Sequence, residues 1–92
     1  MWIIELRFSA ADDSHTADRL AARPAHRARL VEHHAAGRLL AAGPFADESG
    51  AQLIFDVAER AELDRPVGAD PYDGLPGVEV TSIREWHPVV GP

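Results

Sequence analysis

Six stretches of regular hydrophobic pattern follow one another along the chain, and their order restricts the fold more than any other feature of the sequence. In residues 2–8, Trp2, Ile4 and Leu6 alternate with their neighbours in the period-two pattern of a half-buried strand. Further strands are expected over residues 38–42, 51–57 and 78–86, and helices over residues 15–36 and 58–65. The expected order is strand, helix, strand, strand, helix, strand.

This order is that of the ferredoxin-like α+β fold, in which both helices lie on one face of a four-stranded antiparallel sheet. The pattern leaves open which set of alternating residues faces the helices. The other face must be covered or remain wet. Because Trp2, Phe55 and Trp86 are available to the strands, a second copy of the chain is the simplest cover. The sequence therefore predicts a homodimer and leaves any higher assembly open.

The longer helical stretch contains the strongest candidate for a functional side chain, His26. Pro24 suits a first helical turn and Gly37 a helix end, so the stretch is either one bent helix or a short helix followed by a longer one. On a helical wheel, the apolar stripe consists of Leu20, Leu30 and Val31. His26 lies roughly 40° from Leu30, at the margin of that stripe. A marginal position would orient the imidazole and still let it reach a ligand.

The second helical stretch is expected to be short, because Pro66 and Gly68 are residues that break helices. The motif Asp70-Pro71-Tyr72 then opens a loop that ends at Gly77.

The 92 residues suffice for a single domain, residues 1–92, with one core. A formal net charge of −6 disfavours nucleic acid and anionic membranes as partners. The sequence has no cysteine, which excludes disulfides, thiolate metal sites and a cysteine nucleophile. No apolar run approaches the length of a membrane span, and the first residues have the pattern of a strand rather than of a signal peptide. We therefore expect a cytoplasmic protein.

Several short motifs, taken in order, resemble the YCII (YciI-like) family. They are Arg23-Pro24-Ala25-His26, residues 37–44 (Gly-Arg-Leu-Leu-Ala-Ala-Gly-Pro), Gly50, and Asp70-Pro71-Tyr72 followed by Gly77-Val78. Each motif is weak alone, but together they cover nearly the whole chain. The resemblance implies a dimeric α/β-barrel of ferredoxin-like subunits, akin to muconolactone isomerases. It also implies lyase or isomerase chemistry on small ring compounds, such as dehydrochlorination.

The resemblance further implies an active site made of the helix histidine and the aspartate of the Asp-Pro-Tyr motif, which are His26 and Asp70 here. Two features depart from the family pattern. The helix before the motif is usually unbroken, whereas Pro66 and Gly68 are expected to interrupt it in this chain. The loop between the second and third strands is short, so we expect one wall of any pocket to be smaller than in the family.

A histidine–aspartate pair has a definite chemistry. The carboxylate accepts the imidazole N–H and fixes the tautomer, so the other ring nitrogen can take a proton near neutral pH. A substrate with an acidified C–H or O–H would then undergo isomerisation or elimination. The competing interpretation is structural: His26 would be half-buried, and Asp70 would only cap the turn before Pro71.

Two more histidines lie on the same helical stretch. His33 follows His26 by seven residues and shares its face, which makes it a candidate for substrate binding. The competing interpretation is an exposed or a helix-terminal histidine. His34 is expected to point toward the apolar stripe as a structural residue. The five histidines show none of the usual metal-ligand spacings, so we expect neither a metal nor a cofactor.

The remaining candidates each have a structural alternative. Arg23, Arg27 and Arg29 could bind an anionic substrate, although such arginines often form a solvated helix surface. Gly43 and Pro44 could border a pocket or simply bend the strand. Tyr72 could supply a phenol to the pocket or plug the space beneath the loop.

The sequence thus predicts a small dimeric enzyme in which His26 is the general base or acid and Asp70 orients it. The expected reaction is cofactor-free proton transfer on a small, cyclic, oxygenated molecule. The alternative is a non-catalytic small-molecule binder or accessory dimer, which would use the same pocket without turnover.

Overall fold

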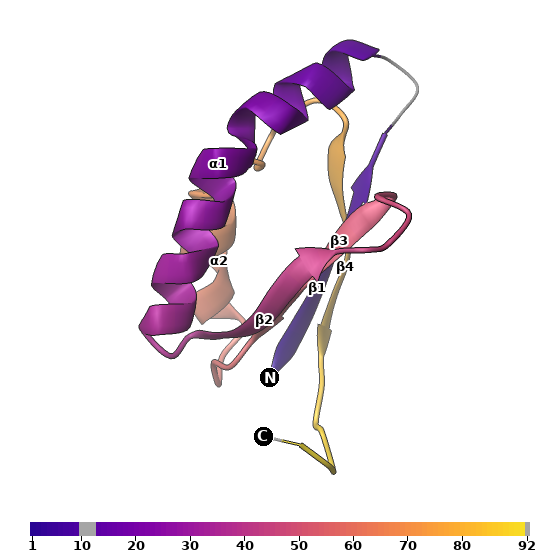
Figure 1. The fold of residues 1–92 in the computed structure, drawn as a ribbon. Coiled ribbons are helices and arrows are strands. Elements are labelled where there is room, and N and C mark those ends of the chain that lie inside the picture. Colours follow the sequence, from indigo (N-terminus) through magenta and orange to yellow (C-terminus); the bar gives the residue numbers. More distant parts are fainter. Residues whose placement is uncertain (10–12, 92) are drawn as a thin grey trace.

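The computed structural model describes residues 1–9 and 13–91 of the chain. Its elements are, in order, β1 (Trp2–Phe8), α1 (Asp13–Ala35), β2 (Leu39–Pro44), β3 (Gly50–Phe55), α2 (Ala61–Gly68) and β4 (Val78–Glu85). The strands form one antiparallel sheet in the order β2-β3-β1-β4 (Figure 1). The ferredoxin-like α+β fold expected from the order of patterns is confirmed. Within the described residues, neither helix has the length and apolar character needed to cross a membrane.

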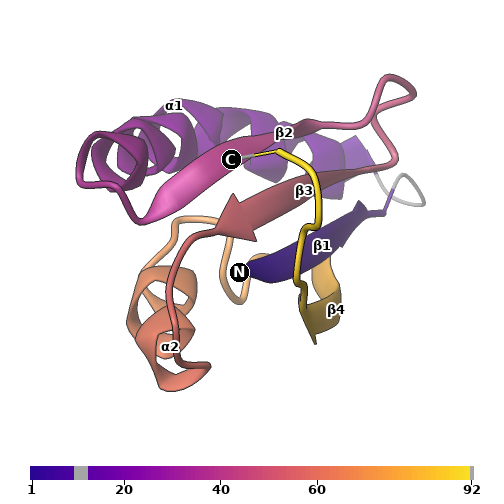
Figure 2. The same cartoon turned by 90° about the horizontal axis from the view of Figure 1, so that it is seen from below.

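The core lies between the sheet and the two helices, which cover the same face of the sheet (Figures 1 and 2). The alternation in β1 decides which side chains enter it: Ile4 is 1% exposed, and Leu6 is also buried. In the register of the sheet, Ile4 pairs with Leu53 of β3, which therefore points to the same side. The even-numbered residues of β1 thus form the floor of any site beneath the helices.

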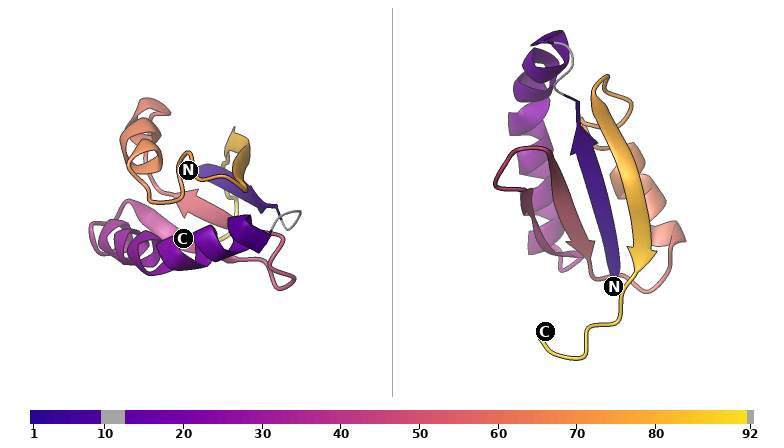
Figure 3. Two further views of the ribbon diagram at one scale, coloured as in Figure 1. Left: turned by 90° about the horizontal axis from the view of Figure 1, so that it is seen from above. Right: turned by 90° about the vertical axis from the view of Figure 1, so that its right-hand side faces the viewer.

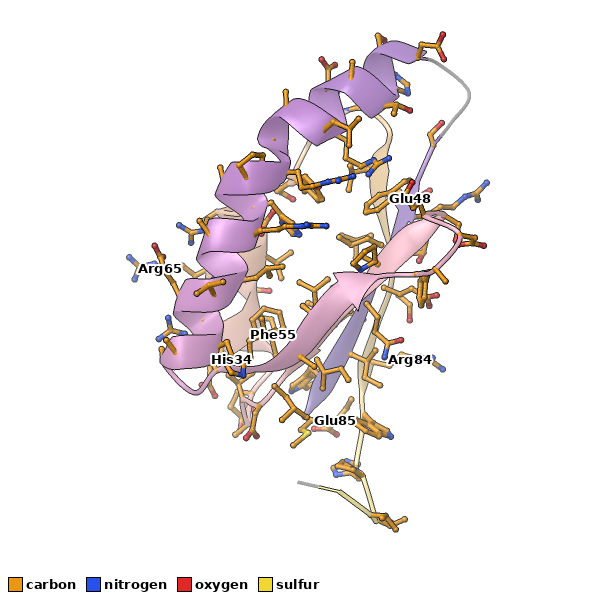
Figure 4. All side chains as sticks on the ribbon, viewed as in Figure 1. His34, Glu48, Phe55, Arg65, Arg84 and Glu85 are labelled. Carbon is orange, nitrogen blue, oxygen red and sulfur yellow. The ribbon has the colours of Figure 1, made fainter. Side chains whose placement is uncertain are left out.

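The other face of the sheet is free of helices, as the right-hand view of Figure 3 shows. The expectation that Trp2 and Phe55 help to cover this face is wrong. The two residues pair with each other in the register, and Phe55 is buried in the core on the helix side (Figure 4). Apolar groups on the open face include Ile3 and Ile54, which also pair with each other and are half-buried. Trp86 follows β4 directly and is 38% exposed.

Helix α1 is continuous through Pro24, so the alternative of two separate helices is wrong. Proline removes only one N–H from the helix, the one that would have bonded to the carbonyl of Leu20. Side chains are buried on both sides of this point, Arg19 before it and His26 after it, whereas Pro24 itself faces solvent. Packing on the sheet therefore outweighs the local preference of the proline, and Figure 1 shows one helix curving over the sheet.

The end of α1 follows from Gly37, which was the expected stop. Gly37 adopts a φ of 78°, in the left-handed region that glycine tolerates best. Its N–H donates to the carbonyl of His34 at 3.0 Å, and the N–H of Arg38 donates to the carbonyl of His33 at 3.0 Å. This pair of hydrogen bonds is the Schellman motif. It also turns the chain so that Arg38 returns to the side of His33.

Helix α2 runs through Pro66 to Gly68, so the expected interruption there is wrong. Because α2 begins only at Ala61, the proline costs a single hydrogen bond, to the carbonyl of Glu62. Leu63, which is 1% exposed, anchors the helix in the core. The chain leaves α2 and reaches Asp70 two residues later, so the helix sets the position of this carboxylate.

Candidate active site

The most buried face of α1 is polar. The buried residues of this helix are Arg19, His26 and His33. Their seven-residue spacing puts them in one line along the helix. Of the predicted apolar stripe, Leu30 packs against the core, whereas Leu20 is 45% and Val31 68% exposed. His26 therefore lies in the middle of the contact with the sheet and not at its margin. Burying polar side chains in this way costs stability unless they have partners, so each of the three needs a partner inside the fold.

His26 meets Asp70 in this interior, 44 residues later in the chain. Its Nδ1 lies 2.6 Å from Oδ1 of Asp70. The same Oδ1 accepts the backbone N–H of Tyr72 at 2.8 Å, the turn that the Asp70-Pro71-Tyr72 motif favours. An ionised carboxylate only accepts hydrogen bonds, so the proton of the pair is on Nδ1 and the lone pair of neutral His26 is on Nε2. Nε2 has no hydrogen-bond partner among the described residues.

Tyr72 fixes the plane of the imidazole. Its ring stacks on that of His26 with centroids 3.8 Å apart and an angle of 6° between the planes. On its other side, Phe8 contacts Tyr72 edge to face at 5.9 Å. Tyr72 is buried in the core cluster, as expected for an aromatic beneath the loop. Asp70 and Tyr72 together hold His26 in one orientation.

Two cavities meet at His26 and Tyr72. The smaller has a volume of about 120 Å³ and is also lined by His33 and Asp70. The larger, of about 400 Å³, is bordered by residues that the sequence singled out, namely Arg23, Gly43 and Pro44. The imidazole is thus open to a guest molecule on one side and tied to its carboxylate on the other.

His33 lies in the last turn of α1, as one of its interpretations had it, but it is buried, so the interpretation as an exposed residue is wrong. Arg38 donates from Nη2 to Nδ1 of His33 at 3.2 Å, which leaves the ring proton on Nε2. That Nε2 is buried and lacks a hydrogen-bond partner among the described residues. Burial lowers the pKa of His33 below its usual range, and the guanidinium groups of Arg38 and Arg29 lower it further. His33 is therefore a neutral donor at pH 7. His34, expected to face the apolar stripe, is exposed (Figure 4).

Arg19 and Phe8 line the larger cavity and were missed in the sequence. The guanidinium carbon of Arg19 lies 4.3 Å from the centroid of the Phe8 ring. The signal that was available is the spacing, since Arg19 precedes His26 by the same seven residues that separate His26 from His33.

No group of three or more histidine, cysteine, aspartate or glutamate side chains suited to a metal ion occurs within residues 1–9 and 13–91. His26 has one carboxylate beside it, and Nδ1 of His33 is engaged by an arginine. The chemistry that this arrangement can perform with its own side chains is proton transfer at Nε2 of His26.

Comparisons with known proteins agree with this fold. A family model described as YCII-related domain matches residues 4–87. A similar solved structure is 5-chloro-2-hydroxyhydroquinone dehydrochlorinase (TftG) from Burkholderia phenoliruptrix AC1100, in complex with 2,5-dihydroxybenzoquinone. The two chains are 22% identical, the match covers 95% of this chain and 94% of the other, and the TM-score is 0.72. No curated protein matches the sequence.

Proposed function

The chain belongs to the YCII-related family, and on that premise we propose that it is an enzyme that moves a proton on a small ring compound. The observation that carries the proposal is the 2.6 Å contact between His26 and Asp70 where two cavities meet. The shared fold with a dehydrochlorinase bound to a quinone supports a cyclic, oxygenated substrate. The reaction is elimination or isomerisation, and it uses the side chains of the chain itself.

In the proposed step, Nε2 of His26 takes a proton from a carbon next to a carbonyl group of the substrate. The electron pair of the broken C–H bond forms a C=C bond, and a leaving group on the neighbouring carbon departs with its own electron pair. Without a leaving group, the imidazolium returns the proton to another carbon and the product is an isomer. Asp70 stabilises the imidazolium through its charge, and the Tyr72 ring, stacked at 3.8 Å, adds a cation–π contact.

The other residues of the site bind and orient the substrate in this proposal. His33 presents a neutral Nε2–H, which suits an oxygen that becomes negative as the proton leaves. Tyr72 and Arg23 form walls of the larger cavity, and Gly43 and Pro44 form its rim along β2.

We also infer a homodimer in the cytoplasm. The face of the sheet without helices carries the half-buried pair Ile3 and Ile54, and a second copy would cover it. Analytical ultracentrifugation measures the assembly, and a monomer at all concentrations would contradict it.

The test follows proton transfer directly. Ring compounds with acidic C–H or O–H bonds, including lactones and chlorinated hydroquinones, are incubated with the protein in D₂O and followed by proton NMR and chloride release. For a compound that the protein turns over, His26→Asn is expected to lower the rate by a factor of about 10² to 10⁴. The matched control is His34→Asn, an exposed histidine of the same helix, which should leave the rate unchanged.

A folded His26→Asn protein that keeps the full rate would end this proposal. The non-catalytic alternative predicts another pattern, in which ring compounds raise the melting temperature but neither deuterium uptake nor product appears.

A further inference from the structure

The larger cavity is strongly cationic although the chain as a whole is acidic. Its lining includes Arg19, Arg23 and Arg27 from α1, against a single carboxylate, Glu48, among the described residues that line it. Glu48 belongs to the exposed turn between β2 and β3 (Figure 4). The net charge of the chain is −6, so this concentration of positive charge is local. The arginines follow one another at intervals of four residues, which places them on one side of the helix.

Arg19 is the most informative of the three because it is buried, with 8% of its surface exposed. No carboxylate pairs with it among the described residues, and its guanidinium carbon lies over the face of Phe8, 4.3 Å from the ring centroid. A buried guanidinium is normally paired with an acid, since desolvating an unpaired charge is costly. The cation–π contact offsets part of that cost, and the N–H donors, which have no partner among the described residues and are not fully buried, remain available to a guest in the cavity that Arg19 lines.

The two neighbouring arginines add further positive charge that no carboxylate of the described residues neutralises. Neither Arg23 nor Arg27 forms a salt bridge within the described part of the chain, and like charges four residues apart on a helix repel each other. An anion bound among the three arginines would relieve this repulsion and would supply hydrogen-bond acceptors for Arg19, Arg23 and Arg27.

The position of this charge relative to His26 is also fixed. Arg19 contacts Phe8, Phe8 contacts Tyr72, and Tyr72 stacks on His26, so the rings form a continuous series from the guanidinium to the imidazole. Leu30 and Leu53 complete an apolar wall beside them. A guest in this cavity therefore meets a cation at one end, apolar surface in its middle and a base at the other end.

We propose that the larger cavity binds the carboxylate of a small ring acid, with Arg19 as the principal anchor and Arg23 and Arg27 at its side. Guanidinium and carboxylate groups match in a bidentate pair, which would also orient the ring toward Nε2 of His26. The identification of this acid as the substrate rests on the proposed function, whereas the binding of the anion does not.

The experiment compares benzoate with benzamide, which has the same shape without the charge, by NMR titration of the full chain. Benzoate is expected to bind at least about tenfold more tightly. Arg19→Gln should lower the affinity for benzoate by about tenfold or more and leave that for benzamide nearly unchanged. The matched control is Arg65→Gln, an exposed arginine of α2 that lies away from the sheet (Figure 4) and should bind benzoate like the wild type.

If Arg19→Gln does not fold, the double substitution of Arg23 and Arg27 by glutamine replaces it, because both residues are more exposed. Equal binding of benzoate and benzamide by the wild type would overturn the inference. So would full affinity for benzoate in a folded variant that lacks these arginines.

The outcomes also separate this inference from the proposed function. If the protein prefers benzoate but turns over no ring acid, the anion-binding cavity is supported and the proposed reaction is not. If it turns over neutral ring compounds through His26 but shows no preference for benzoate, the proposed reaction is supported and the anion-binding cavity is not.

Discussion

Replacing Leu63 by alanine is expected to destabilise the protein by about 3 to 5 kcal/mol. Leu63 is 1% exposed, so the substitution returns none of its surface to water and leaves a hole under α2. Loss of the buried carbon atoms alone is worth roughly 0.8 kcal/mol per methylene, and the unfilled cavity adds to it. For a chain of this length, a loss of about 3 kcal/mol lowers Tm by roughly 12 to 24 °C. Because Asp70 follows α2 by two residues, the hole should also loosen the carboxylate.

The assay is urea unfolding at one fixed protein concentration, with amide hydrogen exchange to localise the effect. Protection should fall first in residues 61–70. Leu20→Ala removes the same atoms from a side chain that is 45% exposed and should cost less than about 1 kcal/mol. If the two variants unfold at the same urea concentration, the assignment of Leu63 as the anchor of α2 is refuted.

Two further outcomes follow from the structure. Gly50→Ala should lower the free energy of unfolding by more than the roughly 1 to 3 kcal/mol typical of overpacking, because the new methyl group would collide with the backbone carbonyl of Leu6. Gly43→Ala is the control, since its methyl group would point into open space and the variant should unfold like the wild type. Equal urea midpoints for the two variants would contradict this reasoning. The lowered pKa of His33 means that the unfolded chain binds more protons, so stability should be complete above about pH 6.5 and fall as the pH drops below it. His33→Gln should lose less in Tm between about pH 7.5 and 5.5 than the wild type, and an identical loss in both proteins would count against that reasoning.

The fold could be predicted from the sequence because its signals are local and agree with one another. The alternation in β1 and the short strand-like runs after it gave the correct order of elements, and Gly37 marked the end of α1. The prolines were misleading because a rule about one residue competes with packing over a whole helix face. Leu63 holds α2 on the core in spite of Pro66, and Arg19 and His26 hold α1 on both sides of Pro24.

The site was predictable in part. His26 and Asp70 came from the resemblance of their motifs, and the structure brings them to 2.6 Å, although no property of residue 26 alone indicates residue 70 as its partner. The burial of α1 could not be predicted, because a helical wheel ranks residues by polarity and therefore selects Leu20 and Val31. The structure buries Arg19 instead, since the cavity beside Phe8 accepts a charged group that an ordinary core would exclude.

The line of Arg19, His26 and His33 has a consequence for how this scaffold can change. These side chains lie between the helix and the sheet, so each belongs both to the contact that keeps α1 in place and to the wall that an incoming molecule meets. Ala22 and Leu30 add apolar contacts from the same helix to the core. A substitution at position 19, 26 or 33 should therefore change ligand binding and stability together, and both must be measured on the same variant to tell the two effects apart.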